Sequence, residues 1–168
     1  MTEKYQLNGN ELIIYDEDLS LDLKSNLKVE KKSLYYEDKK ILAEQNYHKK
    51  LLHGPSIFYS KNRDVLSISW FYEGKKNGKA KKYYSSKKLY SIEKYVDDKM
   101  HTEQIYYFED GSIKTIMNYD MGLLHGEVKL FYENEKLKRH LIFDSGKKIQ
   151  DNIFDTNEKL VDETKFEL

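Results

Sequence analysis

The chain has 168 residues and a formal net charge of zero, with 39% hydrophobic and 35% charged residues. It contains 15 tyrosines, one proline and no cysteine. The lack of cysteine excludes disulfides, thiolate metal sites and a cysteine nucleophile, and the aromatic content argues against a disordered chain. The length suits one domain or a short repeat array.

The charges are unevenly distributed along the chain. Residues 1–22 carry a net charge of −5 and residues 150–168 carry −4, so that the segment between them carries +9. The N-terminus lacks the basic and apolar regions of a signal peptide, and no window approaches the roughly 18 apolar residues that span a bilayer. We therefore expect a soluble, cytoplasmic protein with a basic centre between acidic ends.

The first predicted element is a hairpin within residues 1–22. The stretch YQLNGNELIIY places Asn8-Gly9 between two short apolar segments. An Asn-Gly pair in this setting is a strong hairpin signal. We expect this acidic segment to form an N-terminal capping hairpin.

From about residue 23 onward, the sequence repeats with a period of 24 residues. Five aromatic residues close successive units: Tyr47, Phe71, Tyr95, Tyr119 and Phe143. Six and seven residues after them come His53-Gly54, Asn77-Gly78, His101-Thr102, His125-Gly126 and Ile149-Gln150. Twelve residues after them come Tyr59, Tyr83, Tyr107, Phe131 and Asp155, and eighteen after them come Val65, Leu89, Ile113, Leu137 and Val161. This register indicates a repeat array over residues 23–148. Its decay indicates a degenerate, acidic C-terminal capping repeat over residues 149–168.

Each unit has the pattern of a β-hairpin. Residues 105–119 place two β-rich segments around Glu109-Asp110-Gly111, a combination typical of turns. Gly74 and Gly78 lie where one unit joins the next, and glycine tolerates the positive φ of such reversals. No apolar stripe with a 3.6-residue period persists, which excludes a helical array. The predicted fold is all-β: an elongated, single-layer antiparallel meander of hairpins.

The repeat resembles the bacterial variant of the MORN (membrane occupation and recognition nexus) repeat. The segments YHKKLLHGPSIFY, FYEGKKNGKAKKYY and YDMGLLHGEVKLFY carry the likeness, which covers about residues 30–145. Thr102 and Gln150 depart from it at the glycine position, and Asp155 departs at the aromatic position. The resemblance implies a twisted single-layer sheet. It also implies the functions of the group, in which many members look like antitoxin or immunity proteins and eukaryotic relatives are similar to scaffolds.

Three histidines recur at one repeat position: His53, His101 and His125. Equivalent residues of adjacent hairpins lie about 10 Å apart in a sheet, whereas the ligands of one metal ion lie about 2 Å from it. We therefore expect no metal and no cofactor. A structural role at the repeat turn is assigned to His53, Gly54, Gly78, His101, His125 and Gly126.

No catalytic pattern stands out in the sequence. It has no Ser-His-Asp order, no glycine-rich phosphate loop and no HExxH motif. The carboxylate pairs Asp97-Asp98 and Glu109-Asp110 fall in predicted turns, where acidic residues are common for backbone reasons. A catalytic carboxylate usually needs burial that shifts its pKa. We predict that the protein is not an enzyme and has no catalytic residues.

The segment KKNGKAKKYYSSKK, residues 75–88, is the candidate for anion binding. Its lysines are Lys75, Lys76, Lys79, Lys81, Lys82, Lys87 and Lys88. Lysine with interleaved tyrosine suits nucleic acid or anionic lipid headgroups. Lysines also keep a solvated sheet from pairing with other sheets. Only two arginines are present, Arg63 and Arg139, which argues against nucleic-acid recognition.

Aromatic residues are the candidates for partner binding. They are Trp70, Tyr59, Tyr83, Tyr107 and Phe131. In-register rings stabilise a sheet by pairing across strands, and the same rings on an uncovered face suit protein recognition. We therefore favour a non-enzymatic protein-binding module, an antitoxin or immunity protein that masks a cognate toxin, with acidic ends that suit a basic partner. The alternative is a peripheral membrane or polyanion-binding scaffold acting through residues 75–88.

Overall fold

The computed structural model describes residues 5–8, 11–14 and 28–166. Every regular element in these ranges is a β-strand, and they hold no helix long and apolar enough to cross a membrane. β1 (Tyr5–Asn8) and β2 (Glu11–Ile14) pair antiparallel as a separate two-stranded sheet. The rest of the predicted N-terminal cap, including the Gly9 turn, lies outside the described residues.

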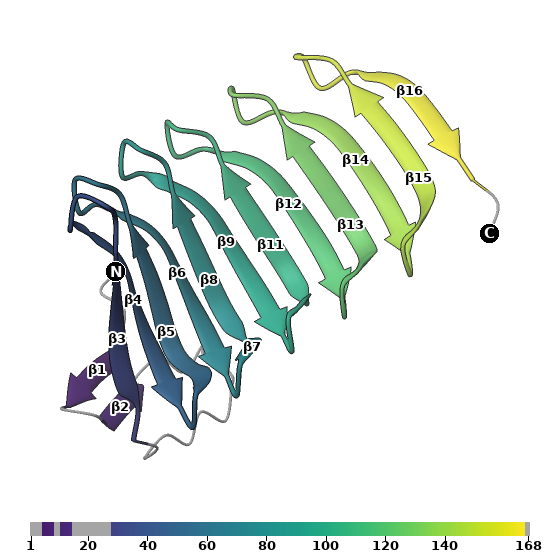
Figure 1. Ribbon diagram of the computed structural model, residues 1–168. Coiled ribbons are helices and arrows are strands. Elements are labelled where there is room, and N and C mark those ends of the chain that lie inside the picture. Colours follow the sequence, from purple (N-terminus) through teal and green to yellow (C-terminus); the bar gives the residue numbers. More distant parts are fainter. Residues whose placement is uncertain (1–4, 9–10, 15–27, 167–168) are drawn as a thin grey trace.

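The other strands form one 14-stranded sheet in which neighbours in sequence pair antiparallel (Figure 1). In chain order they are β3 (Glu30–Tyr35), β4 (Ile41–His48), β5 (Leu51–Tyr59), β6 (Val65–Tyr72), β7 (Lys75–Lys76), β8 (Gly78–Tyr83), β9 (Leu89–Val96), β10 (Lys99–Met100), β11 (Thr102–Tyr107), β12 (Ile113–Asp120), β13 (Leu123–Phe131), β14 (Leu137–Asp144), β15 (Lys147–Phe154) and β16 (Leu160–Lys165). The short strands β7 and β10 pair with β6 and β9. The predicted all-β hairpin meander is confirmed.

The 24-residue period sets where the strands begin. β4, β6, β9, β12 and β14 start at residues 41, 65, 89, 113 and 137. The last unit breaks the period by one residue, because β16 starts at 160. Phe154 pairs with Leu160 as Phe131 pairs with Leu137. The sequence-based alignment of Asp155 and Val161 with the aromatic and aliphatic positions was therefore wrong. The unit has lost one residue and keeps both side-chain types.

The reversals between units are two-residue turns with positive φ at both positions. One example is Glu73 (φ 47°) with Gly74 (φ 86°), and another is Met121 (φ 44°) with Gly122 (φ 93°). Two consecutive positive φ angles define the type I′ turn, which matches the twist of the flanking strands. The His-Gly positions are not these turns. His53 and Gly54 lie within β5, past the reversal, where the pairing with β4 shifts register.

Thr102 adopts the backbone conformation that glycine has in the neighbouring units. Its φ is 61°, against 75° at Gly78 and 83° at Gly126. Positive φ is strained for a β-branched residue. The buried Gln104 side chain supports this bend, because its amide donates hydrogen bonds to the carbonyls of His101 and Thr102 at 3.0 and 3.2 Å.

Replacing Thr102 with Gly is therefore expected to stabilise the protein by about 1 kcal/mol. Thermal and urea unfolding of the Thr102→Gly variant will measure the change. The reciprocal variant Gly126→Ala is the control. A Cβ there meets only Asn118 Cβ at 3.8 Å, so its expected loss comes from the positive φ alone. An unchanged stability in both variants would contradict the strain argument.

Successive residues of a strand point to opposite faces of the sheet, and directly opposite residues of paired strands point to the same face. The register therefore assigns each residue to one of the two faces. The inner row (Tyr47, Phe71, Tyr95, Tyr119 and Phe143) lies on one face, here called the inner-row face. Small buried residues such as Ala43, Ala80 and Ser91 share that face with it. Ile68 and Trp70 are buried on the opposite face. The core is thus distributed along both faces of a single layer.

Candidate binding surface

A second set of aromatic residues follows one end of the hairpins. This turn row consists of Tyr59, Tyr83, Tyr107 and Phe131, and all four side chains are half-buried. In each unit a register shift occurs immediately before the aromatic residue, which then pairs with the first residue of the next long strand. Phe154 extends the row into the last unit. The bulge therefore places one aromatic residue per unit at the same end of the hairpins.

Tyrosines at the adjacent position fix the backbone of this row. The Tyr36 hydroxyl donates a hydrogen bond of 2.8 Å to the carbonyl of Tyr59, in the following unit. Tyr84 bonds the carbonyl of Tyr107 at 2.7 Å, and Tyr132 bonds that of Phe154 at 2.9 Å. Each bond ties one hairpin tip to the next. These hydrogen bonds between neighbouring hairpins consequently hold the backbone of the turn row in place.

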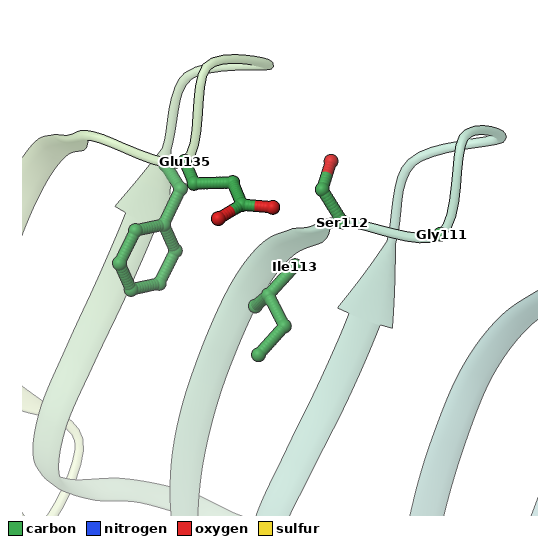
Figure 2. Close-up of a pocket in the computed structure, with 5 residues that line it drawn as sticks. Gly111, Ser112, Ile113 and Glu135 are labelled. Carbon is green, nitrogen blue, oxygen red and sulfur yellow. The ribbon is translucent and has the colours of Figure 1, made fainter.

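Two shallow pockets flank Phe131 in the turn row. One, of about 320 Å³, is lined by Gly111, Ser112, Ile113, Phe131 and Glu135. Figure 2 shows that Ser112 and Ile113 come from one hairpin, whereas Glu135 reaches across from the next. The other pocket, of about 420 Å³, lies between Phe131, Phe108 and Tyr132. Ile113 is one of the exposed large hydrophobic residues. Phe131 thus lines two cavities, each large enough to take a side chain of a partner.

Trp70 does not belong to this surface. It is 3% exposed and lies on the opposite face from the inner row, directly across from Pro55. A side chain that is already buried by its own fold cannot contribute new contact area to a partner. Trp70, predicted as a partner-binding anchor, therefore lies outside this surface.

The lysines of residues 75–88 do not form one patch. Register places Lys76 and Lys82 on the inner-row face, and Lys75, Lys79 and Lys81 on the other. Lys87 and Lys88 lie at the hairpin tip, where Lys87 pairs with Asp64 at 2.7 Å. Because alternate residues of a strand point to opposite faces, a run of lysines in sequence is split between the two surfaces.

Lys82 instead forms an ion pair with the buried carboxylate of Glu93. Glu93 is 0% exposed, and Lys82 Nζ lies 2.8 Å from its Oε1 atom. Ser91 donates to the same oxygen at 3.0 Å, and Tyr95 donates to Oε2 at 2.7 Å. Burial alone would raise the pKa of Glu93, but these hydrogen bonds and the Lys82 charge outweigh it and lower the pKa. Burial and the nearby Glu93 charge raise the pKa of Tyr106 to about 12.

A second buried carboxylate, Asp151, occupies the inner-row face near the C-terminal end. Arg139 binds it with two hydrogen bonds of 2.8 and 2.6 Å, and Lys148 Nζ adds a third at 2.7 Å. Hydrogen bonding from Arg139 is the largest cause of its shift, and with Lys148 it lowers the pKa of Asp151 to about 2. The one-residue deletion explains its position, because Leu141 pairs with Asp151 where the regular register would place Asn152.

The histidine position caps the next turn. His53, His101 and His125 accept hydrogen bonds at Nδ1 from the backbone N–H of Glu73, Met121 and Ser145, at 3.4–3.5 Å. At the equivalent position, Asn77 Oδ1 accepts a hydrogen bond from the backbone N–H of Asp97 at 3.0 Å. Burial, together with the charge of His48, lowers the pKa of His53, which keeps its ring neutral and able to accept. In the described part of the chain, no group of three or more His, Cys, Asp or Glu is placed to hold a metal ion.

Sequence reasoning missed three residues that the structure singles out: Glu93, Gln104 and Asp151. A weak signal existed for Glu93, because Ser91 and Tyr95 lie two residues away on either side and therefore on the same face. Gln104 follows Thr102, the one non-glycine at its repeat position among the regular units. No comparable signal marks Asp151, whose position depends on the deletion.

The comparison with protein families agrees with this architecture. Residues 76–97, 100–121 and 124–145 match the family model described as MORN repeat variant. Each matched segment corresponds to one hairpin unit: the first contains β8 and β9, the second β11 and β12, and the third β14 and nearly all of β13. No match to the chain was found among the curated proteins. Three consecutive matches support a MORN-repeat protein, and MORN repeats are in general non-enzymatic modules that bind proteins or membranes.

Proposed function

We propose that the protein is a non-enzymatic protein-binding module whose contact surface is the turn row. The observation that carries this proposal is the pair of pockets that Phe131 lines. Aromatic anchors in preformed pockets dominate the energetics of protein interfaces. The hydrogen bonds from Tyr84 and Tyr132 hold the row in place, and preorganisation reduces the entropy lost on binding.

Within this class, we propose that the partner is a toxin which the protein masks. The support is the resemblance of the repeats to the variant group that contains antitoxin-like and immunity-like proteins. The membrane or polyanion alternative has less support, since the lysines of residues 75–88 are divided between two faces and Lys82 is bound to Glu93. A scaffold acting through that segment would need them on a common surface.

The binding proposal is tested by affinity capture from host lysate at low and high salt, using wild type and the Phe131→Ala variant. One protein retained at high salt by wild type, with capture at least roughly tenfold weaker for Phe131→Ala, is expected for an anchor residue. Met121→Ala is the control, because Met121 is an exposed apolar residue at the other end of the hairpins. Equal losses in the two variants, or capture only of lipid or nucleic acid at low salt, would contradict the proposal.

Toxin masking is tested separately by expressing the captured protein alone and together with wild type. Growth arrest that is relieved by wild type but less by Phe131→Ala is the expected result. A captured protein that is harmless on its own would leave the binding module intact and exclude the masking role.

A further inference from the structure

The two outermost strands of the sheet each have one edge without a paired strand in the described part of the chain. These strands are β3 and β16. Unpaired N–H and C=O groups along such an edge can pair with a strand of another chain. Exposed apolar side chains gather at the same two ends: Leu34 and Tyr35 on β3, and Leu160, Val161 and Phe166 at β16. Tyr35 (62%) and Val161 (64%) are the most exposed of the large hydrophobic residues described.

The repeat register defines which strand type each edge accepts. β16 pairs with β15 as β4 pairs with β3: Phe154 with Leu160 corresponds to Tyr35 with Ile41. On its other edge, β4 is paired with β5. β3 in turn has the register of β5, since Tyr35 with Ile41 also corresponds to Tyr59 with Val65. The free edge of β16 is thus built to receive a strand of the β5 type, and β3 is such a strand.

We propose that β16 of one molecule pairs antiparallel with β3 of a second copy, so that the meander continues from molecule to molecule. The register is that of β4 and β5, in which Ala43 faces Phe58 and Glu44 faces Ile57. Transferred to the ends, it places Asp162 opposite Leu34 and Glu163 opposite Ser33. This inference concerns the ends of the sheet and is independent of the function proposed for the turn row.

One side-chain contact inside the array has its counterpart at this junction. The Tyr59 hydroxyl donates a 2.8 Å hydrogen bond to Glu44 Oε2 across the β4–β5 boundary. The equivalent residues are Tyr35 on β3 and Glu163 on β16, and both are exposed. In the proposed pairing the Tyr35 hydroxyl of the second copy donates to Glu163 of the first. The junction therefore holds the same tyrosine–carboxylate pair as the β4–β5 boundary.

Charge selects this pairing over the two symmetric ones. β3 carries Lys31 and Lys32 with Glu30, and β16 carries Asp162 and Glu163 with Lys165, so the two strands have net charges of +1 and −1. Pairing β3 with β3, or β16 with β16, brings like charges to one boundary, which is destabilising. Pairing β16 with β3 makes Lys32 a diagonal neighbour of Asp162. Lys165 is equivalent to Asn46, where the β4–β5 register shifts, and it lies 3.3 Å from Glu163.

The expected assembly is weak and open-ended. A six-residue strand edge buries far less than the roughly 1,200 Å² of a stable interface, so association should depend on concentration. Because the two surfaces differ, each added molecule leaves a free β3 and a free β16. Such heterologous contacts produce linear filaments and do not close into a symmetric dimer.

The experiment uses single-cysteine variants, which the absence of native cysteine makes selective. Leu34→Cys and Asp162→Cys full-length chains are prepared separately, checked for wild-type circular dichroism, and oxidised with copper phenanthroline alone and as a mixture. Directly opposite residues have Cβ atoms close enough for a disulfide. Disulfide-linked dimers are expected in the mixture, forming roughly tenfold faster than in either variant alone. Ser85→Cys mixed with Asp162→Cys is the control, because Ser85 is an exposed turn residue away from both ends.

Three results would overturn the proposal. Equal linking in the Asp162→Cys sample alone would indicate tail-to-tail dimers. No excess linking over the Ser85→Cys control, with all variants folded, would show that the ends do not meet. If Asp162→Cys in host lysate cross-links to a different protein and not to the Leu34→Cys chain, the edge of β16 would be assigned to a strand of that other protein.

Discussion

Replacing Lys82 with Met is expected to destabilise the protein by about 3 kcal/mol at neutral pH, because removing one partner of a buried ion pair leaves an uncompensated charge. Glu93 is fully buried, and its two remaining close donors, Ser91 and Tyr95, are neutral. Urea unfolding followed by tyrosine fluorescence measures the difference. The double variant Lys82→Met with Glu93→Gln should recover most of the loss, since no charge is then buried.

The pH dependence of the Lys82→Met variant distinguishes this cause from lost packing. In wild type the pKa of Glu93 is lowered, so its contribution is present above the unfolded pKa and is lost as the pH falls through the folded value. Without Lys82, the hydrogen bond and the charge that most oppose the effect of burial are lost, so that pKa should rise from its wild-type value, and the charged form should stabilise the folded variant less. The deficit should shrink as the pH falls below the ordinary value of 4.5. A constant deficit would contradict the argument. Lys94→Met, an exposed lysine on the other face, should change stability by about 0.5 kcal/mol or less.

Replacing Asp151 with Asn is expected to cost about 2 kcal/mol at neutral pH, from the difference between an ordinary pKa of 3.8 and a folded value of about 2. The loss is smaller than for Lys82→Met because Arg139 and Lys148 keep partly exposed side chains and can be hydrated. No charge is left buried in this variant.

The sign of the pH effect follows from the lowered pKa of Asp151. Its contribution is fully present above pH 3.8 and is lost as the pH falls toward about 2. The difference between wild type and Asp151→Asn should thus be constant from pH 5 to 7 and disappear in strong acid. Asp162→Asn, on the exposed edge strand, is the control and should behave like wild type. A deficit that persists below the folded pKa would point to altered packing.

The architecture could be predicted from the sequence because the repeat constrains it at many positions. The recurrence of Tyr47, Phe71 and their equivalents fixed the period, and turn residues such as Gly111 marked the reversals. Both depend on local chemistry that neighbouring units share. The error in the last unit arose from the same source. A fixed period cannot register a deletion, so Asp155 was aligned where Phe154 lies.

The site was harder to predict because a single-layer sheet has no second layer to bury its side chains. Burial there depends on which side chains of neighbouring strands cover one another. Trp70 is of a residue type that often anchors protein interfaces, yet neighbouring residues bury it. The lysines of residues 75–88 look like one cluster in sequence, but strand alternation divides them. Glu93 has no counterpart at positions 69 or 117, which are Ser and Met. Its importance follows from long side chains that converge on it from adjacent strands.

The strictly sequential strand order also has a mechanical consequence. Within the described 14-stranded sheet, each hairpin pairs its strands with the hairpins before and after it, and the two ends of the sheet lie at opposite ends of the row (Figure 1). A force applied to the termini therefore peels strands from the outside inward, breaking few backbone hydrogen bonds at a time. Each 24-residue unit would lengthen the chain by roughly 80 Å when extended. The molecule should yield in steps at low force, and re-form by adding hairpins to whatever part of the row remains.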